Sequence, residues 1–242
     1  NINKGCYFKF ETGEGNDRCE INGNVNLAKG GYFDIETGEG NDSFILNGNI
    51  NGHGHGSSYM RIDTGAGDDR ISVNGNLGSN DPNEGNYTAI RIDAGEGNDL
   101  IALNGKVAGY YDQYDGVTRY DNIEINGGSG YDTLVLQAPD AATFEQWYGD
   151  WFAGGGLSSV YDCESIIFYG LDANNLPQFV SDVLSNPDYY GINFQVYSGD
   201  ADFGYLQGVG SNDHSMLYVS SDGLDNLGDG SGISPVNSIL LD

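Results

Sequence analysis

The 19-residue stretch Tyr32–Ile50, YFDIETGEGNDSFILNGNI, decides the fold because the chain repeats it. Aligned copies begin at Tyr7, Tyr59 and Ala89, and a weaker copy begins at Asn122. The first glycines of successive loops are 25, 27, 30 and 33 residues apart, and the variation in length falls after the Asn-Gly pair. Insertions confined to one corner of each repeat are typical of stacked repeat proteins.

Apolar and polar residues alternate on both sides of each loop, which predicts strands with one buried face. Before the loop, the inward pairs are Phe8/Phe10, Phe33/Ile35, Met60/Ile62, Ile90/Ile92 and Ile123/Ile125. After the loop, they are Cys19/Ile21, Phe44/Leu46, Ile71/Val73, Ile101/Leu103 and Leu134/Leu136, and a third short side holds Val25, Ile50, Leu77 and Val107. One coil cannot bury its apolar face alone. The prediction is therefore an all-β fold, a right-handed parallel β-solenoid (β-roll or β-helix) with coils about 4.8 Å apart.

The regular pattern ends after residue 138, which divides the chain into a repeat region, residues 1–138, and a non-repeating region, residues 139–242. Alternating stretches at Tyr161–Tyr169 and from Asn193 onward predict short strands. Prolines at 177 and 187 bracket one expected short helix. We expect the second region to be an acidic, mostly β cap or small domain that serves capping or assembly.

Each loop carries chemistry suited to Ca²⁺. Paired glycines let the backbone turn tightly and present carbonyl oxygens, and the following aspartate adds charge. If equivalent loops stack, the aspartates form a like-charged column about 5 Å apart that needs cations. Mg²⁺ fits less well, because it demands strict octahedral geometry and keeps its waters. A metal-free turn is the alternative, but turns alone do not require aspartate in the same slot five times. The predicted ligands are Gly13, Gly15, Asp17, Gly38, Gly40, Asp42, Gly65, Gly67, Asp69, Gly95, Gly97, Asp99, Gly128, Gly130 and Asp132.

The segment Gly13-Glu14-Gly15-Asn16-Asp17 and its copies resemble the repeats-in-toxin (RTX) calcium-binding family, whose nonapeptide is G-G-x-G-x-D-x-U-x. The pattern is also similar to the one-calcium-per-coil solenoid of bacterial ice-binding adhesins. The resemblance covers about the first 137 residues and implies several Ca²⁺ ions in one column between adjacent coils. It also implies that the loop glycines give carbonyl ligands and the aspartates give carboxylates. The chain departs from the family at the usual first glycine, which is Thr12, Thr37, Thr64, Ala94 and, only in the last copy, Gly127.

Composition and the absence of certain motifs exclude several classes of function. With 9 Lys+Arg against 36 Asp+Glu, the net charge is −27, which argues against nucleic-acid partners and anionic membrane surfaces. No apolar run approaches the roughly 20 residues of a membrane-spanning helix. Nucleophile-elbow, zinc-protease and P-loop motifs are missing, so we expect no enzymatic activity. The acidic row Glu11, Glu36, Asp63 and Asp93 is better explained as a field that supports the ion column than as a catalytic pair.

These features predict an extracellular or cell-surface protein with a structural or adhesive role, in a surface layer, filament or long adhesin. The chain begins inside a repeat, which predicts head-to-tail stacking with another copy or with further repeats of a longer chain. Ice binding is an alternative, although the outward loop slots hold Glu14, Glu39, Ala66 and Glu96 instead of threonines. A second alternative is a module that binds or cleaves glycans, in which tyrosine-rich loops contact surface glycans.

Overall fold

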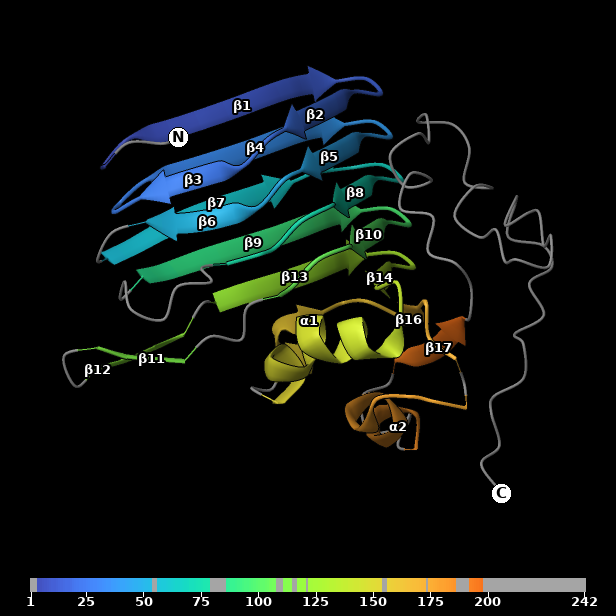
Figure 1. Ribbon diagram of the computed structural model, residues 1–242. Coiled ribbons are helices and arrows are strands. Elements are labelled where there is room, and N and C mark those ends of the chain that lie inside the picture. Colours follow the sequence, from blue (N-terminus) through green and yellow to red (C-terminus); the bar gives the residue numbers. More distant parts are fainter. Residues whose placement is uncertain are drawn as a thin grey trace.

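A computed structural model describes residues 4–53, 56–78, 86–107, 111–114, 117–120, 122–153, 156–172, 174–185 and 192–197. The repeats lie one above another along a single axis, with the non-repeating elements below them (Figure 1). The first sheet contains β1 (Tyr7–Glu14), β4 (Tyr32–Glu39), β7 (Gly56–Asp63), β9 (Asn86–Glu96), β13 (Asn122–Ser129) and β15 (Val160–Tyr161). The second contains β2 (Arg18–Asn22), β5 (Ser43–Asn47), β8 (Arg70–Val73), β10 (Leu100–Leu103), β14 (Thr133–Gln137), β16 (Ser165–Tyr169) and β17 (Asn193–Tyr197).

Smaller pairings complete the strand inventory of the described residues. The strands β3 (Val25–Ala28) and β6 (Ile50–His53) form a third parallel sheet, and isolated bridges extend its column through Leu77 to Val107. The strands β11 (Tyr111–Tyr114) and β12 (Val117–Tyr120) form an antiparallel hairpin beside the stack.

The parallel register agrees with the alignment of the sequence repeats. Gly13 pairs with Gly38, and Gly95 pairs with Gly128, so each loop lies directly on the loop of the next repeat. The inward columns form one core cluster that runs through all repeats, with Ile35, Ile62 and Leu46 at 1% exposure or less. Stacking therefore supplies the burial that a single repeat lacks.

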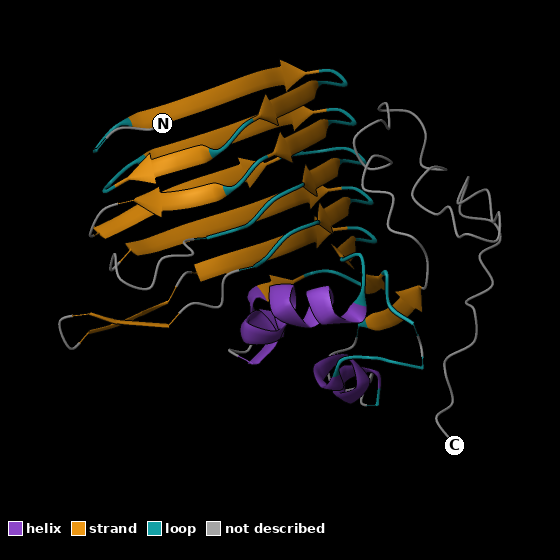
Figure 2. Cartoon of the chain, viewed as in Figure 1, coloured by secondary structure: helices purple, strands orange, loops and turns teal. Residues whose placement is uncertain are grey.

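The predicted class, an all-β right-handed parallel β-solenoid with a mostly β cap, is wrong. The described chain is of the α/β type, with mostly parallel strands in three sheets and a few helices (Figure 2). The non-repeating region contributes α1 (Ala141–Ala153), the short 3-10 helix η1 (Gly156–Ser159) and α2 (Gln178–Leu184). The mostly β cap expected for residues 139–242 includes no helix at α1, although the aromatic residues of this segment have helical spacing. Phe144, Tyr148 and Trp151 lie at i, i+4 and i+7 and bury one face of α1.

The structure confirms other elements predicted for the non-repeating region. The strand expected at Tyr161–Tyr169 corresponds to β15 and β16, the strand after Asn193 corresponds to β17, and the proline-bracketed helix corresponds to α2. The short strands expected beyond residue 197 lie outside the described residues. Of the helices in the described part of the chain, none has the length and apolar character needed to cross a membrane.

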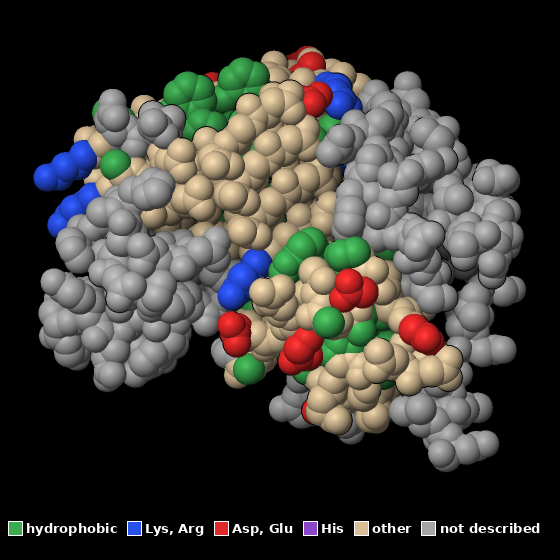
Figure 3. All heavy atoms as spheres, viewed as in Figure 1, with side chains coloured by type: hydrophobic (Ala, Val, Ile, Leu, Met, Phe, Trp, Pro, Cys, Tyr) green, Lys and Arg blue, Asp and Glu red, His purple; other side chains and the backbone are tan. Residues whose placement is uncertain are grey.

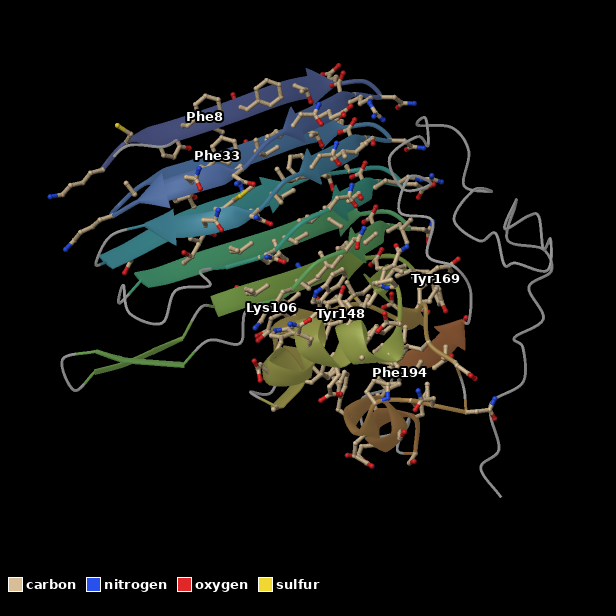
Figure 4. All side chains as sticks on the ribbon, viewed as in Figure 1. Phe8, Phe33, Lys106, Tyr148, Tyr169 and Phe194 are labelled. Atoms are coloured by element: carbon tan, nitrogen blue, oxygen red, sulfur yellow. The ribbon has the colours of Figure 1, made fainter. Side chains whose placement is uncertain are left out.

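The helix α1 closes the core through one buried hydroxyl. Figure 4 shows Tyr148 on α1, below the last strands of the repeats. Its hydroxyl, fully buried, lies 2.8 Å from the Leu103 carbonyl oxygen and 2.9 Å from that of Gln137, and it accepts the Gln137 N–H at 3.3 Å. The Val107 N–H donates to the Trp147 carbonyl at 3.0 Å, so α1 also takes the place of a further strand on the short third side.

We expect Tyr148→Phe to lower the free energy of unfolding by about 1–3 kcal/mol, because the substitution leaves buried carbonyl groups without their donor. Urea denaturation followed by circular dichroism measures the change. The control is Tyr161→Phe, since Tyr161 is 49% exposed. Equal stability of the two variants would contradict the assignment of Tyr148 as the link between α1 and the repeats.

Candidate metal centre

The corner loops join the first sheet to the second and depend on glycine. Gly38 and Gly40 have φ angles of 109° and 124°, a region that side chains disfavour. A Cβ added to Gly38 would lie 2.0 Å from the Gly13 carbonyl oxygen, and one added to Gly40 would lie 2.2 Å from that of Gly15. Both carbonyls therefore point along the stack toward the next loop, and any side chain would collide with them.

The aspartates at these corners form a continuous file, as the repeat alignment predicts. The backbone N–H of each donates to the Oδ1 of the next: Asp17 to Asp42 at 2.8 Å, Asp42 to Asp69 at 2.7 Å, Asp69 to Asp99 at 2.7 Å and Asp99 to Asp132 at 2.8 Å. We call these five residues the aspartate file. One oxygen of each carboxylate thus fastens a repeat to its neighbour.

The second oxygen of every member has no hydrogen-bond partner. The Oδ2 atoms of Asp17, Asp42, Asp69, Asp99 and Asp132 are all buried and unpaired. Four of these residues are at most 3% exposed. A buried carboxylate oxygen without a donor is costly, and stacking five of them adds like-charge repulsion. This row of unpaired oxygens fits a row of bound cations.

Burial has a direct electrostatic consequence for the aspartate file. It raises the pKa of Asp69 to about 8 and that of Asp99 to about 7, and the next carboxylate along the file adds to each effect. It also raises the pKa of Asp132, with Glu164 and Asp162 as the neighbouring charges. Without a bound cation, these groups hold protons at a pH where exposed aspartates are ionised.

Columns of amide side chains show that the hydrogen bond itself needs no charge. The Oδ1 of Asn49 accepts the Asn76 N–H at 2.8 Å, and that of Asn76 accepts the Lys106 N–H at 2.9 Å. In the exposed part of the corner loops, the Oδ1 of Asn16 accepts the Asn41 N–H at 2.9 Å. Asparagine would therefore serve the same structural purpose in the aspartate file. The hydrogen bonds between repeats therefore do not by themselves require the carboxyl groups of the aspartate file.

The predicted glycine ligands divide into two groups. The first glycines of the loops belong to the first sheet, either because they pair in its register or because their carbonyl oxygens accept its backbone hydrogen bonds. They are Gly13, Gly38, Gly65, Gly95 and Gly128. Thus the Gly38 carbonyl accepts the Ala66 N–H at 2.9 Å, which leaves one lone pair for a metal. The second glycines of the loops lie in the turns beyond the strands; they are Gly15, Gly40, Gly67, Gly97 and Gly130.

Side chains alone do not make a metal site among the described residues. No group of three or more His, Cys, Asp or Glu residues there has the spacing of a metal cluster. A cation in the aspartate file would draw on one or two carboxylates together with backbone carbonyls, a ligand set that Ca²⁺ accepts.

The acidic row beside the loops forms ion pairs with basic residues of the first sheet. Glu36 pairs with Lys9 at 2.8 Å and with Arg61 at 2.9 Å, and Asp93 pairs with Arg91 at 2.8 Å. Glu11 and Asp63 likewise pair with Lys9 and Arg61. The row therefore balances the basic residues on the outer face of the first sheet.

Sequence reasoning missed a sixth carboxylate. The Oε2 of Glu164 accepts the Asp132 N–H at 2.7 Å and so continues the aspartate file by one position. The segment around Glu164 has no Gly-x-Gly motif, which is why the repeat search passed over it. The sequence nevertheless indicates its position. Glu164 lies two residues before the inward-facing Ile166, just as Asp132 lies two residues before Leu134, with which Ile166 pairs.

Comparisons with protein-family models, curated proteins and solved structures found no match to this chain.

The raised pKa values predict how the metal-free protein responds to pH. For an acid whose pKa is raised by folding, the stability is highest when the group is protonated, and it falls as pH rises from the unfolded pKa, near 4, to the folded value. With Asp69 at about 8 and Asp99 at about 7, the melting temperature in excess chelator should fall between pH 5 and pH 8.

Two isosteric variants isolate this effect. Asp69→Asn removes one titrating group, so its melting temperature should fall less over the same range, whereas Glu39→Gln, at an exposed position of the preceding loop, should keep the wild-type slope. Differential scanning calorimetry at several pH values in chelator makes the measurement. A melting temperature that is independent of pH, or identical slopes for both variants, would contradict the buried-charge account.

Proposed function

We propose that this chain is an extracellular, calcium-stabilised structural or adhesive protein, and that it is not an enzyme. The observation that carries the proposal is the aspartate file, with its five buried and unpaired Oδ2 atoms. Residues 1–138 would bind several Ca²⁺ ions in one column between adjacent repeats. The described part of residues 139–242 would cap one end of the core, where Phe144, Tyr148 and Trp151 join the cluster.

The donor chemistry favours Ca²⁺ over other common cations. Carboxylate and carbonyl oxygens are hard ligands, which Ca²⁺ takes six to eight at a time in flexible geometry, whereas Mg²⁺ requires a strict octahedron and retains water. Zinc and copper prefer nitrogen and sulfur ligands. Calcium supplies charge neutralisation between repeats. The residues of the aspartate file hold the ion, and the glycines keep the space around it free of side chains.

Calcium dependence supports a location outside the cell. Extracellular modules use weak sites that millimolar calcium saturates, while the cytosolic concentration leaves such sites empty. In low calcium, only protons neutralise the buried carboxyl groups of the aspartate file, and this costs more stability as the pH rises toward the raised pKa values of Asp69 and Asp99. Folding would therefore be completed after export, where binding of the ion adds its free energy to the folded state.

The exposed end of the repeats supports self-association. On β1, Tyr7 is 60% exposed, Phe8 44% and Phe10 39%, whereas the equivalent Phe33 is 7% exposed because β1 covers it. In Figure 3, hydrophobic side chains gather at the upper end of the molecule, where Figure 1 places β1. Figure 4 shows Phe8 above Phe33, with ring centroids 4.9 Å apart. The partner proposed for this face is another repeat of the same kind, from a second copy or from more of a longer chain.

We expect Asp69→Asn to lose calcium-dependent stability while it keeps its fold. Asparagine Oδ1 still accepts the Asp42 N–H, but the charge that would face the ion is gone. At calcium 100 times above the dissociation constant, the loss of one ion removes about 3 kcal/mol. Calorimetric melting with and without calcium measures the difference, with Glu39→Gln, at an exposed position, as the control of equal charge change.

The sign of the effect in chelator makes this test specific. In chelator, Asp69→Asn should be at least as stable as the wild type, because it removes a buried charge; in calcium it should be less stable. A wild-type protein whose circular dichroism and melting temperature ignore excess chelator would overturn the proposed function.

We expect self-association to require the exposed aromatic face. The variant Phe8→Lys/Phe10→Lys should remain monomeric in calcium at concentrations where the wild type forms larger species, since its two added charges resist burial. Sedimentation velocity measures size, and calcium titration checks that the double variant still binds the ion. A monomeric wild type in calcium would exclude a second copy as the partner of this face.

A further inference from the structure

We propose that Tyr7 and Tyr32 form an oxidative cross-linking site, at which one-electron oxidation driven by a peroxide joins the two phenol rings in a dityrosine bond. The site needs neither calcium nor a second copy of the chain, so it goes beyond the proposed function. It belongs to a row of tyrosines on the outer face of the first sheet, which the strand register aligns. We call this row, Tyr7, Tyr32 and Tyr59, the tyrosine column.

Successive rings of the tyrosine column lie close together. The ring centroids of Tyr7 and Tyr32 are 4.9 Å apart, with planes inclined by 29°, and those of Tyr32 and Tyr59 are 4.7 Å apart at 27°. Both separations are at the short end of the range for aromatic pairs. The column ends at Ala89, which pairs with Tyr59 and carries no ring. Two phenols in such contact can combine once both are oxidised.

Position along the column selects Tyr7 as the ring that moves. Figure 1 shows β1, which carries Tyr7, at the end of the stack. Tyr7 is 60% exposed and, among the described rings, is stacked on one side only, whereas Tyr32 lies between two rings. A dityrosine bond joins the ring carbons next to the two hydroxyl groups, so one ring must tilt toward the other. Tyr7 has the room to tilt, and we therefore expect the bond between Tyr7 and Tyr32.

A buried carboxylate is in place to take the phenol proton. The Tyr7 hydroxyl donates to the Oδ2 of Asp34 at 2.9 Å, and Asp34 is only 4% exposed. A phenol that loses an electron becomes a strong acid, so a base within hydrogen-bond reach lets the proton leave with the electron. Asp34 thus favours oxidation of Tyr7 over that of an exposed tyrosine without such a partner.

The reaction balances with hydrogen peroxide as the oxidant and a haem peroxidase as its catalyst. Each phenol gives up one electron and one proton, and the two phenoxyl radicals form one carbon–carbon bond. The two carbons of that bond then lose their hydrogens as protons, and both oxygens are protonated again. In total, two hydrogen atoms leave the protein and reduce one peroxide to two water molecules. The product ties the first repeat covalently to the second.

Peroxidase and hydrogen peroxide acting on the full chain test the site. The background is Cys6→Ser, because the exposed Cys6 thiol beside Tyr7 would compete for the oxidant. At a concentration at which sedimentation velocity shows a monomer, the monomer should lose the mass of two hydrogen atoms and gain dityrosine fluorescence. Trypsin should then release residues 5–9 linked to residues 30–61, because cleavage follows Lys4, Lys9, Lys29 and Arg61.

Single substitutions assign the bond within these peptides. Tyr7→Phe and Tyr32→Phe should each abolish the linked product, whereas Tyr59→Phe should keep it; phenylalanine preserves the ring stack, and circular dichroism checks the fold. Tyr161→Phe is the matched control, since Tyr161 is 49% exposed and lies outside the tyrosine column. Asp34→Asn still offers the Tyr7 hydroxyl an acceptor but removes the base, and should slow the linkage by at least about tenfold.

Three results would overturn the site. They are a linked product that survives Tyr7→Phe, a dityrosine bond found only between two copies, and recovery of residues 5–9 solely as an unlinked peptide after oxidation. Each of them leaves the calcium proposal standing, because the reaction is run and read out without reference to the ion. Conversely, a protein that takes up no calcium can still form the bond.

Discussion

The repulsion between buried carboxylates in file is the constraint on which the repeated part of this molecule depends. Backbone pairing brings equivalent corners together, and each corner carries an aspartate whose Oδ1 fastens the neighbouring repeat. The same geometry aligns the unpaired Oδ2 atoms. The interaction that orders the stack therefore also concentrates carboxyl groups in a buried place, which raises the pKa of Asp69 and Asp99. Glycines make this possible, because their carbonyls occupy the space that side chains would fill.

The outer face of the first sheet solves a similar problem by other means. There, acidic residues alternate with Lys9, Arg61 and Arg91, which hold them in ion pairs at the surface. Such pairs contribute little individually in water. In the aspartate file, by contrast, the second oxygens of the five carboxyl groups have no hydrogen-bond partner. The outer face thus balances its carboxylates with cationic side chains of the same sheet.

The repeated elements were predictable from sequence because the pattern states them several times. The pairing of Gly13 with Gly38, and the burial of the Ile35 and Leu46 columns, follow from alignment and alternation. The predicted fold class was wrong, because the helix α1 occurs only once and no repeated pattern marks its helical spacing. Glu164 escaped for a related reason: its role depends on strand register, which places it beyond Asp132. A residue defined by its neighbour in space leaves no motif along the chain.

The hydrogen bonds of the aspartate file all run in one direction. Each N–H donates to the carboxylate of the following repeat, whereas in the asparagine columns the donor belongs to the later repeat and the acceptor to the earlier one. The stack consequently has polarity, like a filament with unlike ends. At one end the Glu164 carboxylate accepts the last N–H of the file; at the other, Asp17 is the first residue to donate. If two copies do stack as proposed, a mirror-like contact would bring identical acidic ends face to face, whereas a head-to-tail contact would join unlike ends.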